Sequence, residues 1–195
     1  MLKQKTTTNK IKKYLQFLLL VFFVANFALF IQIETFILLK VVLTFLSIWF
    51  LALFFKNDWD FLIILENFLL ATILFYFLDT GLLSHVWAYL IFVVLSLFYF
   101  FAIHWNKSEI DDYKKHIIYI GLLSLLMTEA FAFLKFLPID SKNRAIILVL
   151  IFWYFDQIYF YYRAKTINKM IVFNLTAIFL IIFVIIISTL ELLGR

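Results

Sequence analysis

The chain has 195 residues, of which 66% are hydrophobic and 22% aromatic, whereas soluble domains are roughly 45–50% apolar. A soluble fold of this length could not bury so much apolar side chain, so the composition excludes a soluble globular domain and predicts a protein dissolved in lipid. The chain has no cysteine, which excludes disulfides and thiolate metal sites, and its net charge of +5 comes from basic residues in short segments beside apolar runs. That placement is typical of membrane insertion and speaks against nucleic-acid binding.

Seven apolar runs follow one another along the chain, each about 20 residues long, which is the length at which a helix spans roughly 30 Å of hydrocarbon. They are expected at 14–33, 36–55, 61–78, 83–103, 116–137, 145–162 and 170–190. We therefore predict an all-α fold, a polytopic transmembrane helical bundle that forms a single domain over residues 14–190. A basic tail (1–13) precedes this domain, a short tail (191–195) follows it, and no extramembrane domain is expected.

The connections between the runs are short and carry turn or charge signals. They are expected at 34–35, 56–60, 79–81, 104–115, 139–144 and 163–169. Trp59 is expected to be an interfacial anchor before the third span. The connection at 104–115 has mixed charge and is expected to be a short amphipathic or irregular link. Pro138, the only proline, is expected to end the fifth span.

Basic residues are divided unevenly between the two sides that this topology creates. One side has twelve, namely five within 1–13 together with Lys56, Lys107, Lys114, Lys115, Arg163, Lys165 and Lys169. The other side has four, namely Lys135, Lys142, Arg144 and Arg195. Because basic connections remain in the cytoplasm, we predict a cytoplasmic N-terminus and an external C-terminus in a plasma or bacterial inner membrane.

Apart from Lys135, which is expected at the outer surface near the end of the fifth span, four charged residues fall inside the predicted spans. They form the candidate intramembrane polar site, namely Glu129, Lys40, Asp156 and Glu66. Charge inside a span is costly and persists where it is used or paired. At about 1.5 Å per residue, Glu129 and Lys40 both fall in the outer half of the membrane, and we expect Glu129 to face the bundle interior with Lys40 as its partner. Glu66 and Asp156 fall about 7 and 10 Å from the inner side, either as helix-pairing polar groups or as proton-coupling carboxylates.

Asp79 and His85 are weaker candidates, because they lie within about two helical turns of each other near the outer face. They could form a weak metal site there, although solvation of a loop is the simpler interpretation. The chain has three histidines, and none stands in an HxxxH or HExxH arrangement. Glycine-rich phosphate loops and GxSxG nucleophile motifs are also absent. The sequence therefore predicts no catalytic residue, no metal ligand and no cofactor.

The segment from Glu129 through Phe136-Leu137-Pro138 to the basic link at 163–169 resembles a family of small multi-pass bacterial membrane proteins of unknown function. The similarity covers about residues 119–190 and depends on one acidic residue upstream of that tripeptide and on the apolar pattern after it. The resemblance implies an integral inner-membrane protein. It supplies no catalytic residues.

Three functions are compatible with these features. The first is a non-enzymatic scaffold or partner subunit of a membrane assembly, because the connections are short and catalytic motifs are absent. The second is a small-molecule transporter or substrate-binding membrane subunit, in which intramembrane carboxylates couple to protons. The third is a lipid-linked membrane enzyme that uses Glu129, Asp79 and His85 as acid and base groups. We prefer them in that order, with the lipid bilayer and a membrane protein as the expected partners.

Overall fold

The computed structural model describes residues 2–56, 59–107, 113–163 and 165–193. Within these residues the chain is helical, and its helices are α1 (Leu2–Ile33), α2 (Ile37–Phe55), α3 (Asp60–Asp79), α4 (His85–Lys107), α5 (Tyr113–Leu134), α6 (Ser141–Arg163) and α7 (Lys169–Leu193). Each of the seven contains a stretch long and apolar enough to cross a membrane. The predicted all-α, multi-pass transmembrane bundle is thus confirmed.

The helix boundaries differ from the predicted ones most at the start of the first helix, and by up to four residues elsewhere; α6, for example, begins at Ser141 and not at residue 145. Helix α1 begins at Leu2, so the basic N-terminal segment continues the first helix instead of forming a separate tail. Helix α5 ends at Leu134, four residues before Pro138. There the backbone turns tightly, and the N–H groups of Phe136 and Leu137 donate to carbonyls three residues back at 3.1 Å. Most of the predicted irregular connection at 104–115 lies outside the described residues or within the ends of α4 and α5.

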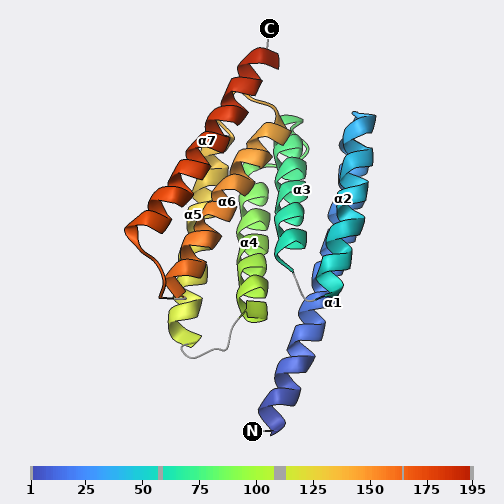
Figure 1. The fold of residues 1–195 in the computed structure, drawn as a ribbon. Helices are drawn as coiled ribbons and strands as arrows, with labels where there is room; N and C mark the ends of the chain where they lie inside the picture. Colours follow the sequence, from blue (N-terminus) through green and yellow to red (C-terminus); the bar gives the residue numbers. More distant parts are fainter. Residues whose placement is uncertain (1, 57–58, 108–112, 164, 194–195) are drawn as a thin grey trace.

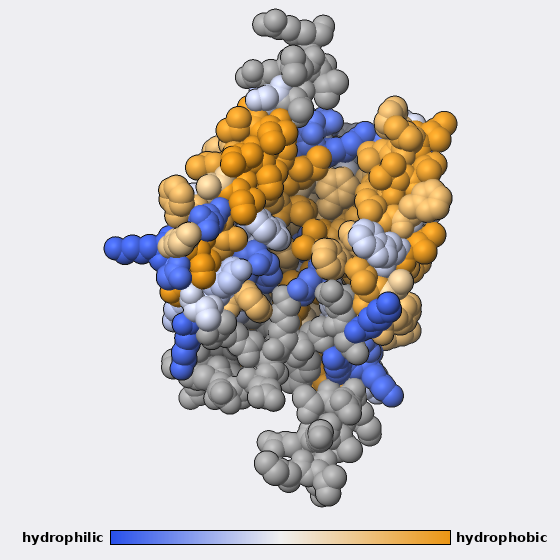
Figure 2. All heavy atoms as spheres, in the orientation of Figure 1, coloured by the Kyte–Doolittle hydropathy of each residue, from blue (hydrophilic) through white to orange (hydrophobic). Residues whose placement is uncertain are grey.

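The helices run alternately up and down, with the N-terminus at the lower end of the bundle and the C-terminus at the upper end in Figure 1. The α1–α2, α3–α4 and α5–α6 connections therefore lie at the upper end, and the other three lie at the lower end. Figure 2 shows apolar side chains covering most of the upper and middle parts of α7 and α2, with hydrophilic side chains gathered nearer the ends. This distribution is the one that a hydrocarbon layer requires.

Helix α3 is the centre of the bundle. It packs most extensively against α6, and also against α1, α2 and α4. Of the residues in its span, 72% are buried, compared with 17% for α2 and 6% for α7. Helices α2 and α7 are thus peripheral, because α2 contacts mainly α3 and α7 contacts mainly α6. The buried polar groups on α3 must find their partners inside the protein, since neither water nor lipid reaches them.

A stack of three phenylalanine rings joins α3, α4 and α5. The ring of Phe131 on α5 lies between Phe75 and Phe92, with centroids 4.4 and 4.5 Å away. Tyr89 meets the same ring edge-on at 5.8 Å. Rings at these separations attract one another beyond the area that they bury. The stack fixes how α5 is rotated about its axis.

Trp59 is buried, so the expectation of an interfacial anchor is wrong. Its ring packs against Phe54 at the end of α2, with centroids 5.6 Å apart. The ammonium group of Lys12 lies 5.4 Å from the centre of the indole ring. Only four residues separate α2 from α3, so Trp59, which directly precedes α3, lies against the end of α2 and belongs to the core.

Replacing Phe131 with alanine should lower the free energy of unfolding in detergent by about 3 kcal/mol, because the change removes the middle ring of the stack and leaves a cavity. Phe133→Ala on the same helix is the matched control, since Phe133 is 66% exposed and Phe131 is fully buried. Thermal unfolding monitored by tryptophan fluorescence gives the comparison. Equal losses for the two variants would contradict the assigned rotation of α5.

Candidate functional site

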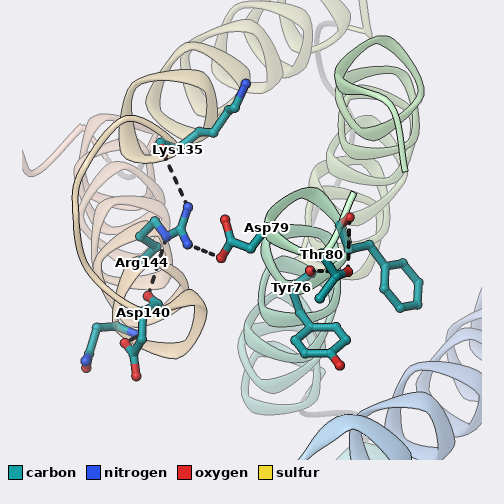
Figure 3. A network of polar contacts seen from close by, with 8 residues as sticks. Tyr76, Asp79, Thr80, Lys135, Asp140 and Arg144 are labelled. Carbon is teal, nitrogen blue, oxygen red and sulfur yellow. Dashed lines mark hydrogen bonds and ion pairs between the residues drawn. The ribbon is translucent and has the colours of Figure 1, made fainter. Parts of the chain in front are cut away.

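The guanidinium group of Arg144 organises the upper end of the bundle. Arg144 lies in the first turn of α6, and its side chain is only 5% exposed. It forms an ion pair with Asp79 at the C-terminus of α3, and it donates hydrogen bonds to the main-chain oxygens of Lys135 (3.3 Å) and Asp140 (3.5 Å) (Figure 3). The same group lies 5.0 Å from the ring centre of Phe75. One side chain therefore connects α3, the α5–α6 connection and the start of α6.

The sequence explains why α6 begins where Arg144 needs it. Asp140 precedes the first residue of α6, and its carboxylate accepts a hydrogen bond from the N–H of Asn143 at 2.9 Å. This is an N-cap, which satisfies one of the free N–H groups of the first turn. Because the cap fixes the start of the helix, it also fixes the position from which Arg144 extends toward α3.

His85 and Asp79 contact two different cations. The Lys135 ammonium lies 2.9 Å from Nε2 of His85, so this ring nitrogen accepts a hydrogen bond from the charged amine. Asp79 is engaged by Arg144. Among the described residues no group of three or more His, Asp or Glu side chains could hold a metal ion. The two weaker candidates therefore contribute to the polar contacts of the upper end and do not converge on a common ligand position.

A second ion pair joins the α1–α2 turn to α6. The Glu34 carboxylate, whose side chain is 1% exposed, accepts a hydrogen bond from the Lys142 ammonium at 3.0 Å. It also accepts one from the N–H of Phe36 at 2.8 Å, which holds the turn into α2. Burial raises the pKa of Glu34, but the hydrogen bonds from Phe36 and Lys142, with the charge of Lys142, outweigh burial, and the pKa lies below its ordinary value. Glu34 is charged at neutral pH.

Sequence reasoning misses the structural roles of Arg144 and Glu34. Glu34 directly follows the first apolar run and Arg144 directly precedes the sixth, so the sequence places both residues in surface connections. The sequence does show that the three connections of the upper end contain both acidic and basic residues, which indicates that ion pairs can form among them. Which acid meets which base depends on the order of helices around α3, and that order is not written in the local sequence.

Glu66 cross-links three helices in the core. It lies on α3 and is fully buried. Its Oε1 accepts hydrogen bonds from the hydroxyl of Tyr99 on α4 (2.9 Å) and from the amide of Asn26 on α1 (3.4 Å), whereas Oε2 has no hydrogen-bond partner in the described structure. Asn67, its neighbour, donates to the carbonyl oxygen of Ile63 one turn earlier at 2.9 Å. The contacts of Glu66 are therefore with α1 and α4.

Asp156 is a buried residue on the lower half of α6. Near it, the rings of Tyr119 and Tyr159 stack with centroids 3.7 Å apart and join α5 to α6. Glu66 forms no hydrogen bond with Asp156. The two acidic residues that the sequence places at similar depth thus belong to different contacts, Glu66 with α1 and α4 and Asp156 at the α6 side of the bundle.

Glu129 does not face the bundle interior, so this prediction is wrong. The buried face of α5 comprises Leu123, Met127, Phe131 and Leu134. Glu129 is two residues from both Met127 and Phe131, which turns it about 200° from each and onto the opposite side of the helix. There it is exposed among exposed apolar side chains of the same face.

Lys40 is not the partner of Glu129 within one chain. Lys40 lies on α2, which packs on α3, whereas α5 packs on α4 and α6. The predicted pair fails because α3 and α4 separate the two helices. Neither side chain has an ion pair or hydrogen bond with any other part of the chain that the structure describes.

Arg144→Met should lower the free energy of unfolding by about 2–3 kcal/mol, because the variant removes an ion pair and two further hydrogen bonds from a buried group. The loss is smaller than for a fully buried pair, since the Asp79 side chain is 43% exposed and regains water. Arg144→Lys is the control, because it keeps the charge and loses the planar fork, and it should give an intermediate loss. Chemical unfolding in detergent measures the stability of both variants. If both were as stable as the wild type, Arg144 would not hold the upper end of the bundle together.

Stability should also fall in acid because of Glu34. Its pKa is lowered in the folded chain, so its contribution is present above about pH 4.5 and is lost as the pH falls through the lowered pKa. At pH 7, Glu34→Gln should lower the free energy of unfolding by about 1–2 kcal/mol and should therefore unfold at a lower temperature than the wild type. The difference between the two should shrink on acidification to about pH 3. A difference independent of pH would show that the ion pair with Lys142 contributes nothing.

No family model, no curated protein and no solved structure matches the chain. The resemblance of residues 119–190 to small bacterial membrane proteins therefore stays an expectation from the sequence. The described part of the chain has three polar features: paired charges at the upper end, a polar cross-link in the core, and the outward-facing carboxylate of Glu129 within the α5 span.

Proposed function

We propose that the protein is a non-enzymatic partner subunit of a membrane assembly. The observation that carries this proposal is Glu129, an acidic residue that lies within the α5 span and points away from the rest of the chain. We further propose a plasma or bacterial inner membrane with the lower end of the bundle in the cytoplasm. The distribution of basic residues supports that orientation.

The position of Glu129 is energetically unfavourable for a protein surrounded only by lipid. A carboxylate at the centre of a span costs about 2.5–3.5 kcal/mol on insertion scales, and Glu129, five residues from the upper end of α5, bears a part of that cost. The buried acidic residues Glu66 and Asp156 reduce that cost through contacts inside the protein, and Glu129 has none in the described chain. A hydrogen-bonding or cationic group from another transmembrane segment would reduce the cost.

The surface around Glu129 also suits a helix as a neighbour. Glu129 lies in the upper half of the exposed face of α5, between the exposed side chains of Leu122 and Leu125 below it and Phe133 above it. Gly121 belongs to the same face, and a side chain added there would meet no described atom within 4 Å. Small residues let the backbone of a second helix approach closely. A polar centre within an apolar face is typical of contacts between membrane helices.

The alternatives have less support. A lipid-linked enzyme would need Glu129, Asp79 and His85 at one position, but Asp79 and His85 are engaged by Arg144 and Lys135, and Glu129 points outward. A transporter would use Glu66, whose hydrogen bonds hold the central helix to α1 and α4. Moving those helices apart would leave three buried polar groups without partners.

A photoreactive amino acid at Leu125, one turn from Glu129, should crosslink to protein in native membranes. The same amino acid at Ile181 on α7 is the matched control, since the two positions are 57% and 60% exposed, and it should crosslink to lipid alone. Glu129→Leu should reduce the protein crosslink at position 125, because the polar contact is lost. Mass spectrometry identifies the product. Lipid adducts alone at both positions would refute the proposal.

A further inference from the structure

Lys40 is the second charged residue that the described chain leaves unpaired inside its spans. Its half-buried side chain lies on the flank of α2, and Thr44 is exposed one turn further along. The Thr44 hydroxyl donates a hydrogen bond to the main-chain oxygen of Lys40 at 2.7 Å. Thr44 therefore presents a small side chain at the surface, and its hydroxyl donor is already satisfied. Lys40 lies at the edge of the buried face of α2, about 20° around the helix from buried Ser47, and Thr44 lies about 40° further toward the exposed side. A neighbouring helix would therefore meet the exposed part of the Lys40 side chain beside Thr44.

Lys40 and Glu129 lie at similar depth in the membrane. Lys40 is three residues from the upper end of α2, which begins at Ile37, and Glu129 is five residues from the upper end of α5, which ends at Leu134. At about 1.5 Å per residue these positions are roughly 4.5 and 7.5 Å below the helix ends. A lysine side chain is long enough to cover the difference. The two charges are opposite, and no other part of the described chain neutralises either of them.

The two helices lie on different sides of the bundle, with α2 at one edge and α5 beyond α4 and α6 in Figure 1. A contact between Glu129 and Lys40 therefore needs two copies of the chain. Using the α5 face twice about a two-fold axis would bring Glu129 against Glu129, which is unfavourable for two carboxylates in a span. A head-to-tail contact, α5 of one copy on α2 of the next, brings opposite charges together.

We propose that the helix that covers the α5 face is α2 of a second copy of this chain, with Glu129 of one copy paired to Lys40 of the next. The inference rests on the proposed function, in which this face is an interface, and it names the partner. Because the contact is heterologous, each copy keeps one free α5 face and one free α2 face until a ring closes. The assembly is then a ring or a row of identical chains in the membrane.

Introduced cysteines test the contact, because the chain has none of its own. Leu125→Cys and Thr44→Cys are placed in separately tagged copies that are expressed together, and the yield of disulfide-linked dimer is measured in membranes. Leu125→Cys with Ile181→Cys is the control pair, since α7 has no role in the proposed contact. The first pair should give a dimer and the control pair should not.

Charge reversal then separates a contact between copies from one within a copy. Glu129→Lys alone and Lys40→Glu alone should each lower the yield about threefold to tenfold, since each creates a like-charge contact. Expressing the two single variants together should restore the yield, because the introduced lysine of one copy then meets the introduced glutamate of the other. The double variant by itself should also restore it.

The outcomes distinguish this inference from the proposed function. Restoration by the double variant but not by the mixed single variants would indicate a pair within one chain and would overturn the inference. A photocrosslink from position 125 to a different protein, with no cysteine-linked dimer, would overturn the inference and leave the proposed function standing. Lipid adducts alone at position 125 would overturn both. If the charge variants do not accumulate, the cysteine pairs with wild-type charges still decide between dimer and no dimer.

Discussion

Burial of α3 by four neighbouring helices is the constraint on which the other features depend. A helix enclosed in this way exposes little of its surface, so its buried polar groups must be satisfied within the protein. Glu66 is held by α1 and α4, and Asp79 at the end of the same helix is held by Arg144 from α6. The polar residues of α3 thereby select the helices that surround it. Apolar packing alone would specify those neighbours poorly, because lipid and leucine are similar surroundings for an apolar face.

The same requirement separates the charges of the chain into two kinds. Those in the interior and at the upper end, such as Glu34, Glu66 and Arg144, have partners within the chain. Glu129 on α5 and Lys40 on α2 have none among the described residues. The first group holds the helices of one chain together, and the second group is the one on which the proposed contact between copies depends.

The sequence predicted how deep in the membrane the candidate residues lie, but it could not predict toward which side of the helix their side chains point. Counting residues along each run places Glu66, Asp156, Glu129 and Lys40 at levels that the helix bounds support. Direction around the axis is normally predicted from an apolar stripe on one face. These helices are apolar on every face, so the pattern carries no such stripe. The outward direction of Glu129 follows from the position of Phe131 between Phe75 and Phe92, which is a contact between distant segments.

The sequence by itself determined that the chain is a membrane protein with seven apolar helices. Apart from the start of α1, it also determined where the helices begin and end to within four residues, because helix length and hydropathy are local properties that the bilayer thickness selects. Only the tertiary structure decided that α3 is central, that Trp59 is buried, and that Asp79 meets Arg144 across 65 residues of chain. These outcomes depend on which helices are neighbours. In a bundle whose faces are uniformly apolar, neighbours are selected by a few polar and aromatic contacts between distant segments, and no local pattern records them.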